Sequence, residues 1–289
     1  MKIDSGNENG GSSGNADELE RDRNGYVVLR RKHSELYKKV TYTSNKKEVV
    51  DNITEYDIRR ANTSVLRQTN KLKEETISAI EALPGIDRKV IIGKMERLDP
   101  KLKKVIAKEI KMAKLMLFQS NGIMDDDILS IKNDAIFIIG RRLKKTVFGD
   151  IEFRAKNKYS AYIAYEGLEV YYNSKENKVD LKGVSDEIIE HTDHQNGMLR
   201  FLANVMRYIS LGQKDKLRKY LISFTEDYKS MNLPVEYYRE MNKENAYRTK
   251  MSIGKYCLNL DVVNDDMKDM IDGIYNYSRF VLPLIQIYI

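Results

Sequence analysis

The sequence predicts an α+β fold, with an antiparallel sheet and packed helices followed by a helical C-terminal part. Three observations support this prediction. Residues 128–139 and 151–183 contain short β-branched and aromatic runs separated by polar turns, which are typical of antiparallel strands. Residues 99–122 carry the start and stop signals of one long helix. Apolar residues recur at helical spacing from Met198 to Ile209.

Length and charge limit the classes of protein to which the chain can belong. The 289 residues suffice for one large or two small domains, and the net charge of +7 favours a polyanionic partner such as nucleic acid. No apolar run approaches the length of a membrane span, and no secretory signal is visible. The single Cys257 excludes an internal disulfide. We therefore expect no membrane partner and a cytoplasmic location, which is the host cytoplasm if a phage encodes the chain.

The composition divides the chain into three regions. Residues 1–22 contain the run GNENGGSSGN and are expected to be a disordered tail. Residues 23–190 are expected to form the α+β domain, and residues 191–289 a helical C-terminal domain. The last ten residues, 280–289, are strongly apolar, so we expect them to pack in the core or against a protein partner.

The N-terminal part alternates between short strands and helices. Apolar and β-branched runs predict strands at 26–29 and 40–43, and a further strand that ends near Asp57. Residues 62–83 have an imperfect apolar helical face that Pro84-Gly85 stops, and a helical segment follows at 88–98.

The long helix begins at Asp99, a good N-cap, with Pro100 at its first position. It is expected to run to about Ser120, where Asn121-Gly122 stop it. Basic residues follow one another along it at helical spacing. They are Arg97, Lys101, Lys104, Lys108 and Lys111. One interpretation is a solvated helix face, and the other is a stripe that neutralises the phosphates of a nucleic acid or a nucleoside triphosphate.

The segment ILSIKNDAIFII, residues 128–139, predicts a tight hairpin with its turn at Lys132-Asn133-Asp134. Asp134 is therefore expected at the tip, either as an ordinary turn residue or as a ligand. The three acids 125–127 are interpreted as a solvated turn, because successive side chains point in different directions. Arg141 and Arg142 add positive charge just beyond the hairpin.

Residues 151–183 predict a β-meander with turns at Glu166-Gly167 and 173–177. Its tyrosines fit cross-strand packing, and the alternative is stacking on bases. Helices are then expected at 198–209, 213–230 and 234–250. His191 and His194 flank Asp193, but without a cysteine partner they are weak evidence for zinc.

Two carboxylates carry the chemical hypothesis. Asp57 is expected at a strand end and Asp134 at a hairpin tip, which is how polymerase palm domains hold two magnesium ions. Mg²⁺ prefers oxygen ligands and often takes only one or two protein carboxylates together with substrate phosphates. Two such ions clamp the attacking and leaving oxygens of phosphoryl transfer. We therefore predict Asp57 and Asp134 as catalytic residues and as ligands of Mg²⁺.

The order of these motifs resembles the palm and thumb base of family B DNA polymerases, in a reduced, phage-like form. Residues 57–64 are similar to that family's first motif at its first Asp and last Ser, and residues 132–137 keep the second Asp and the strand of its third motif. Lys158-Tyr159 and residues 171–184 resemble the segment where that family contacts the primer–template duplex, with Lys182-Gly183 as its Lys-Gly pair. The resemblance covers about residues 25–190 and implies a palm-like sheet.

Three departures accompany the resemblance. Lys132 replaces the first Asp of the third motif, and Asn62 stands where the family has the Tyr that screens the sugar 2′ position. The family's Lys-rich finger motif has no clean match here. The departures motivate an alternative in which the scaffold binds nucleic acid without catalysis.

Three functions are therefore weighed. The first is a magnesium-dependent nucleotidyltransferase that acts on nucleic acid. The second is a non-catalytic protein that binds nucleic acid or a replication partner. The third is a phage structural or assembly protein with the N-terminal tail and the apolar C-terminus as its contacts. In the first two, the residues expected to bind the nucleic acid or the triphosphate are Lys101, Lys104, Lys108, Lys111, Arg141, Arg142 and Lys182.

Overall fold

The structure of the chain is a computed structural model. It describes residues 18–21, 27–30, 33–183, 196–234, 237, 251–253, 256–258 and 276–289. Among the described residues, no helix is both long enough and apolar enough to cross a membrane. The α+β class predicted from the sequence is confirmed, since antiparallel strand pairs and helices are both present and the last described segment is helical.

The chain divides into two compact units. Unit 1 comprises residues 1–43, 56–138 and 142–155, and unit 2 comprises residues 44–55, 139–141 and 156–289. The chain thus passes from one unit to the other within strands as well as between them. Each unit has its own hydrophobic core and is described separately below.

Most of a six-stranded sheet belongs to unit 1. Its strands, in spatial order, are β3 (Thr41–Thr43), β6 (Ile128–Lys132), β7 (Ala135–Ile139), β5 (Ile53–Ile58), β9 (Ile151–Tyr159) and β8 (Val147–Phe148). The hairpin of β6 and β7 therefore lies directly beside β5. The amide of Gly140, just after β7, donates to the carbonyl of Asn52, just before β5 (2.7 Å). The end of β7 thus meets the start of β5, so these two strands run antiparallel.

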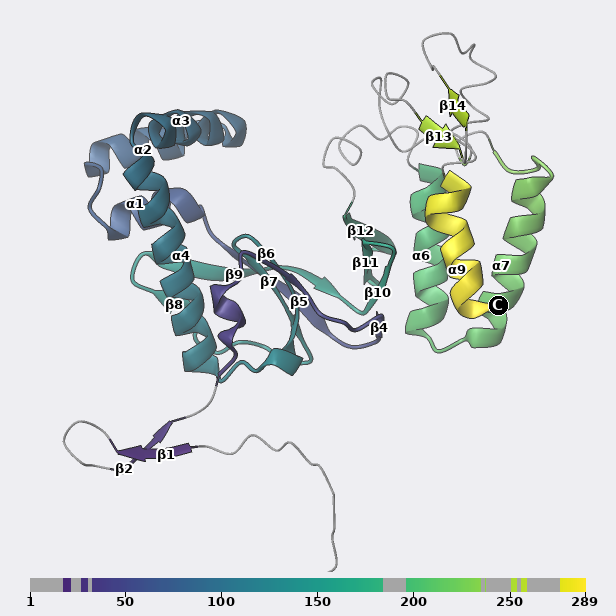
Figure 1. The fold of residues 1–289 in the computed structure, drawn as a ribbon, viewed down its shortest axis with the longest axis horizontal. Helices are drawn as coiled ribbons and strands as arrows, with labels where there is room; N and C mark the ends of the chain where they lie inside the picture. Colours follow the sequence, from purple (N-terminus) through teal and green to yellow (C-terminus); the bar gives the residue numbers. More distant parts are fainter. Residues whose placement is uncertain are drawn as a thin grey trace, which may run out of the picture. The chain divides into compact units, whose positions relative to one another are not determined.

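Four helices connect β5 to β6 (Figure 1), and buried residues of the first, second and fourth share one hydrophobic core with the sheet. They are α1 (Ala61–Gln68), α2 (Glu74–Ala82), α3 (Gly85–Leu98) and α4 (Pro100–Asn121), and short 3₁₀ turns occur at Glu35–Lys38 and Asp125–Asp127. Leu66 of α1 and Leu117 of α4 are fully buried in the same hydrophobic cluster as Ile131 and Ile136 of the β6–β7 hairpin. Burying such aliphatic side chains contributes roughly 1.5–3 kcal/mol each, so this core holds the helices on the sheet.

The predicted hairpin is confirmed, with one correction. Lys132 pairs with Ala135, so the turn is the two residues Asn133-Asp134 and Lys132 belongs to the strand. Asn133 adopts a left-handed conformation (φ 57°), as a tight hairpin turn requires. The register shifts between Ile128 and Ser130, and this bulge lets Ile128 and Ile131 both reach the helix-covered core.

The helix predicted over 62–83 is wrong as a single element. The chain leaves the helix after Gln68, and Asn70 takes a left-handed conformation (φ 50°) before α2 begins. Asparagine tolerates that conformation, so it can end a helix without Pro or Gly. The capping signals predicted for α4 are confirmed. The Asp99 side chain accepts from the Lys101 amide (2.9 Å), and Gly122 ends the helix with φ 57°.

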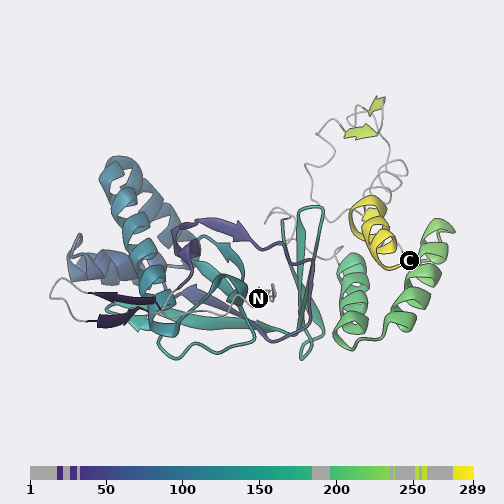
Figure 2. The same cartoon turned by 60° about the horizontal axis from the view of Figure 1, so that its bottom comes forward.

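Unit 2 contains a four-stranded sheet and a group of helices. The sheet has the order β12 (Lys178–Lys182), β11 (Leu168–Asn173), β10 (Ala161–Tyr165) and β4 (Glu48–Val49), and the helices are α6 (Asn196–Ser210), α7 (Lys214–Lys229) and α9 (Leu282–Tyr288), with a π-helical segment at Tyr277–Val281 before α9. Figures 1 and 2 both show α6, α7 and α9 side by side. The predicted meander and the helices at 198–209 and 213–230 are thereby confirmed.

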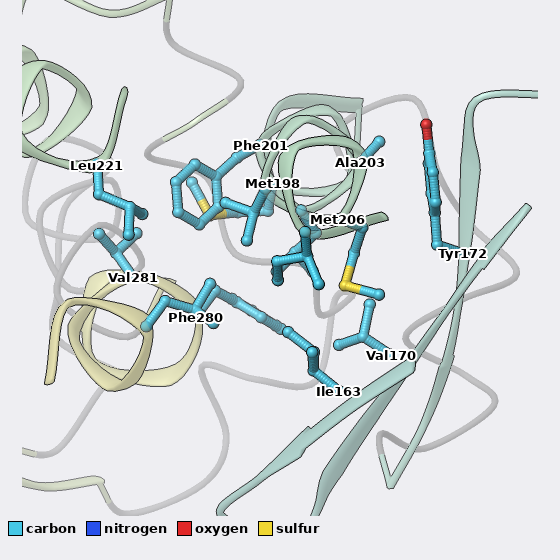
Figure 3. Packing of buried hydrophobic residues seen from close by; sticks show 14 of the residues in the cluster. Ile163, Val170, Tyr172, Met198, Phe201, Ala203, Met206, Leu221, Phe280 and Val281 are labelled. Atoms are coloured by element: carbon cyan, nitrogen blue, oxygen red, sulfur yellow. The ribbon is translucent and has the colours of Figure 1, made fainter. Parts of the chain in front are cut away.

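The core of unit 2 lies between α6, the C-terminal segment and this sheet. Figure 3 shows Phe280 and Val281 among side chains of α6, α7 and the strands, including Met206 and Ile163. The prediction that the apolar C-terminal segment packs in the core is therefore confirmed for Phe280, Val281 and Leu284, which are fully buried. Gly183 closes the meander with φ 88°, and a Cβ there would lie 2.0 Å from the Gly167 carbonyl oxygen, so only glycine fits.

Two small hairpins complete the described chain. β1 (Glu18–Arg21) pairs with β2 (Val27–Arg30), and β13 (Met251–Ile253) pairs with β14 (Tyr256–Leu258). Glu18–Arg21 thus form a strand within the region predicted as a disordered tail, and residues 1–17 lie outside the described residues. The same holds for His191, Asp193 and His194, and for most of the helix predicted at 234–250.

Candidate functional site

A cavity of about 890 Å³ lies in unit 1, beside the turn of the β6–β7 hairpin. Its walls come from the segment before β3, the start of α1, and helices α3 and α4. Nine basic side chains of the described chain line it: Lys38, Lys39, Arg60, Arg88, Lys89, Lys103, Lys108, Lys111 and Lys114. Glu96 and Asp134 are the acidic side chains of the described chain that line it. The excess of positive charge makes this cavity suited to anions.

Apolar side chains form the inner wall of the same cavity. Ile58, Ile92 and Ile106 are buried there, and Tyr37 contributes an aromatic ring. A cavity with apolar walls and a few convergent polar groups is typical of small-molecule sites. Because the convergent groups here are cationic, a ligand with an apolar ring and several phosphates matches both parts of the lining.

Lys114 is the buried cation of this site. Its side chain comes from α4, and the residue is only 3% exposed. The ammonium donates to the carbonyls of Lys39 (2.7 Å) and Asn133 (3.3 Å), so it ties the β3 segment and the hairpin turn to the helix. Burial lowers the pKa of Lys114 to about 8, although the nearby Asp134 carboxylate opposes that shift.

Arg60 lies where β5 ends and α1 begins. It is the N-cap residue of α1 and has a left-handed backbone (φ 49°, ψ 48°). Its guanidinium donates through Nη1 to Oε2 of Glu81 (2.7 Å). Glu81 also accepts from Thr63 Oγ1 (2.8 Å) and lies within 3.5 Å of the Arg67 guanidinium. A network of charged hydrogen bonds therefore fixes one side of the cavity mouth.

Asp134 is at the tip of the hairpin and lines the cavity. Its carboxylate lies close enough to Lys114 to act on that residue's pKa. Asp134 is therefore at the point where the cationic lining meets the end of the sheet.

Asp57 lies near the end of β5, next to the strand that follows Asp134. Because the end of β7 meets the start of β5, the start of β7 lies near the end of β5. The structure thus brings both predicted acids to the same end of adjacent strands. Tyr56 and Ile58 pack in the helix-covered core, so Asp57 between them faces the other side of the sheet, and it does not line the cavity.

The predicted magnesium ligands contribute one carboxylate to the cavity, that of Asp134. In the described part of the chain, no group of three or more His, Cys, Asp or Glu side chains is placed to hold a metal. Mg²⁺ often takes one or two protein carboxylates plus substrate phosphates. Of the two predicted ligands, Asp134 lines the cavity and Asp57 does not.

The other predicted binding residues separate into three groups. Lys108 and Lys111 line the cavity. Lys101 and Lys104 are exposed on α4, and Arg142 is exposed elsewhere in unit 1, and these three do not line it. Arg141 and Lys182 belong to unit 2.

Sequence reasoning missed most of the cationic lining. Lys103, Lys111 and Lys114 are spaced by eight and three residues, which places them on one side of α4, and this spacing was the available signal. The predicted stripe omitted Lys103 and Lys114, and its members Lys101 and Lys104 do not line the cavity. Arg60, Arg88 and Lys89 join the site only through the packing of α1 and α3, which no local pattern reveals.

Comparison of the sequence with models of known protein families identifies one match. The sequence matches the model of a family described as the bacteriophage PBS1 gene 130 protein over residues 29–289. No curated protein matches the chain. The phage part of the predicted resemblance is thereby supported, while the polymerase part stays a prediction. Because the match spans well over half of the sequence, the chain belongs to the bacteriophage PBS1 gene 130 protein family.

Proposed function

We propose that this phage protein is a magnesium-dependent nucleotidyltransferase, and that its cationic cavity receives the triphosphate of the incoming nucleotide. The observation that carries the proposal is the position of Asp134, a carboxylate at the rim of a cavity lined by nine basic side chains. The antiparallel pairing of β5 with β7 supports it, because it brings Asp57 to the same end of the sheet. The resemblance to a polymerase palm predicts that the two carboxylates meet at this end, whereas Asp57 faces away from the helix-covered core and does not line the cavity.

The side chains of the cavity have separate tasks in this proposal. The cations of α3 and α4 neutralise the phosphates, while Ile92 and Ile106 offer an apolar surface to the base. Lys114 holds the Asn133 carbonyl and so fixes the turn that carries Asp134. Magnesium, held by Asp134 with phosphate oxygens, would supply charge neutralisation during phosphoryl transfer. Asp57 as a second ligand remains a prediction.

The test is nucleotide incorporation by Asp134→Asn, which removes the charge and keeps the size of the side chain. We expect at least about a hundredfold loss of incorporation into a primed DNA or RNA template in the presence of Mg²⁺, since electrostatic stabilisation of phosphoryl transfer has effects of this order. Asp150→Asn is the matched control, because Asp150 is exposed in unit 1 and does not line the cavity. Equal incorporation by the two variants and wild type contradicts the proposal.

A second function is favoured by a different observation. Lys114 lies near Asp134 in the cavity, and Asp57 does not line the cavity. The basic lining is therefore present without the pair of carboxylates that a two-metal mechanism needs. The protein would then bind nucleic acid without catalysis. Titration of a single-stranded and a duplex oligonucleotide at several salt concentrations, with and without Mg²⁺, separates the two functions. Salt-sensitive, magnesium-independent binding without incorporation favours the second.

The third function, in phage assembly, rests on the apolar C-terminus. Part of that segment is already used inside unit 2, where Phe280 and Leu284 are buried. Ile287 and Ile289 remain more than half exposed and are the residues through which a protein partner could bind. Light scattering of the purified chain tests this idea, and a monomer at all concentrations counts against it.

A further inference from the structure

We propose that Arg60 contacts the ligand phosphates in the cavity of unit 1, and that Glu81 is a positioning residue that holds the Arg60 guanidinium there. The inference rests on the proposed binding of a triphosphate in this cavity. It adds one contact residue and one positioning residue that the sequence patterns did not indicate.

The backbone of Arg60 is held in a conformation that arginine seldom adopts. Its φ of 49° lies in the left-handed region. Its carbonyl accepts from the Ser64 amide (3.0 Å). This bond fixes the first turn of α1 and so determines where the side chain starts. Strained residues that the surroundings hold in place cluster at ligand sites.

The guanidinium of Arg60 has N–H donors that do not bond to Glu81. Nη1 donates to Glu81, and among the described residues no other acceptor is bonded to this side chain. The side chain is 42% exposed and lines the cavity. Since a guanidinium carries five N–H donors in a planar fork, the donors that Glu81 does not use are available to phosphate oxygens.

Glu81 keeps its place whether or not Arg60 binds a ligand. Its side chain is only 14% exposed, and Thr63 and Arg67 both donate to it. Arg67 is itself anchored by Glu74, with Nε and Nη2 at 3.0 and 2.9 Å from its two carboxylate oxygens. Burial raises the pKa of Glu81, but the hydrogen bonds from Thr63 and Arg67 outweigh it and lower the pKa overall, so the carboxylate is ionised at neutral pH.

Two roles of Glu81 predict opposite changes in ligand affinity when its charge is removed. A carboxylate beside an anion site repels the ligand, so removing its charge tightens binding if repulsion is its main effect. If Glu81 positions Arg60, removing its charge loosens binding instead. Glu96 provides the matched comparison, because it also lines the cavity and no hydrogen bond or ion pair to it is found among the described residues.

The experiment measures the dissociation constant of a base-labelled fluorescent nucleoside triphosphate for the full chain. Arg60→Gln is expected to weaken binding by about tenfold or more, since a charged hydrogen bond and an ion contact are lost. Glu81→Gln is expected to weaken it by roughly threefold to tenfold, whereas Glu96→Gln tightens it by up to about threefold. Glutamine keeps the size of each glutamate, and thermal melts confirm that the variants fold.

A double-mutant cycle isolates the positioning role. In an Arg60→Gln background, Glu81 has no guanidinium to hold, so Glu81→Gln should now tighten binding slightly, as Glu96→Gln does. A purely structural role of Glu81 would give the same loss in both backgrounds. The inference is overturned if Glu81→Gln tightens binding in the wild-type background, or if Arg60→Gln binds like wild type. Failure of the wild-type chain to bind the probe overturns the proposed triphosphate site itself.

Discussion

The two units stabilise themselves with different side chains. The core of unit 1 is largely aliphatic, with isoleucines of the hairpin packed under α1 and α4, and its rim is built from charged hydrogen bonds. The core of unit 2 is rich in aromatic rings, among which Phe201 and Phe224 have centroids 4.2 Å apart. The contrast teaches that the two units bury different kinds of charge. Unit 1 buries the cation Lys114 beside its cavity, whereas unit 2 buries the carboxylates Glu55 and Glu169, which accept hydrogen bonds from tyrosine hydroxyls beside its aromatic core.

The largest expected effect is a loss of stability caused by a substitution in the aromatic core of unit 2. Phe201→Ala removes a fully buried ring that contacts Phe224 and Tyr220. We expect the free energy of unfolding to fall by roughly 3–5 kcal/mol, as for other buried Phe→Ala changes. Urea denaturation followed by far-UV circular dichroism measures it. Under native conditions, binding of the fluorescent triphosphate should be unchanged, because the cavity belongs to unit 1. A loss below about 1 kcal/mol would contradict this account of the core.

A smaller effect concerns the buried ammonium of unit 1. Burial lowers the pKa of Lys114 to about 8, below the ordinary lysine value of 10.5. Between these values the unfolded chain binds more protons than the folded chain, so the free energy of unfolding should rise as the pH increases from 8 toward 10. The expected rise is of the order of 1–3 kcal/mol, since each pKa unit corresponds to about 1.4 kcal/mol.

The control for this pH dependence is Lys114→Met, which lacks the titrating group. The stability difference between wild type and Lys114→Met, measured by urea denaturation at several pH values, isolates the lysine. Tyrosines with raised pKa values, such as Tyr220 of unit 2 at about 12, lower stability at higher pH, but they do so in both proteins. A difference that does not change between pH 8 and 10 would show that Lys114 is not the cause.

The smallest expected effect is at the start of α4. Asp99→Ala removes the oxygen that accepts from the Lys101 amide. We expect a loss of about 1 kcal/mol in the free energy of unfolding, which is usual for an N-cap. Asp99→Ser should restore most of it, because serine is also a good cap. An equal loss in both variants would mean that the capping bond contributes little.

Local signals predicted the parts of the fold that depend on neighbours in sequence. The cap at Asp99, the stop at Gly122 and the turn at Asn133 are short-range features, and each is found where its residue type indicated. The break between α1 and α2 was missed, since Asn70 carries no obligatory breaker signal.

The candidate site was predictable only in part, for a physical reason. Asp134 follows from hairpin chemistry, so its place at a tip could be predicted from the amino-acid sequence alone. Lys114 could not be placed in this way, because its burial depends on carbonyls of Lys39 and Asn133 that are remote in sequence. Arg60 likewise depends on Glu81, which α2 supplies.

The alternation of the chain between the two units has a practical consequence for dissecting them. The boundaries fall after Thr43, Glu55, Ile138, Arg141 and Ala155, so no single cut releases either unit whole. A fragment that begins at Lys156 would lose β4, whose Val49 pairs with Tyr162, and would leave an unprotected sheet edge prone to aggregation. Deletion mapping would therefore report misfolding rather than lost activity, and assigning roles to each half requires point substitutions in the intact polypeptide.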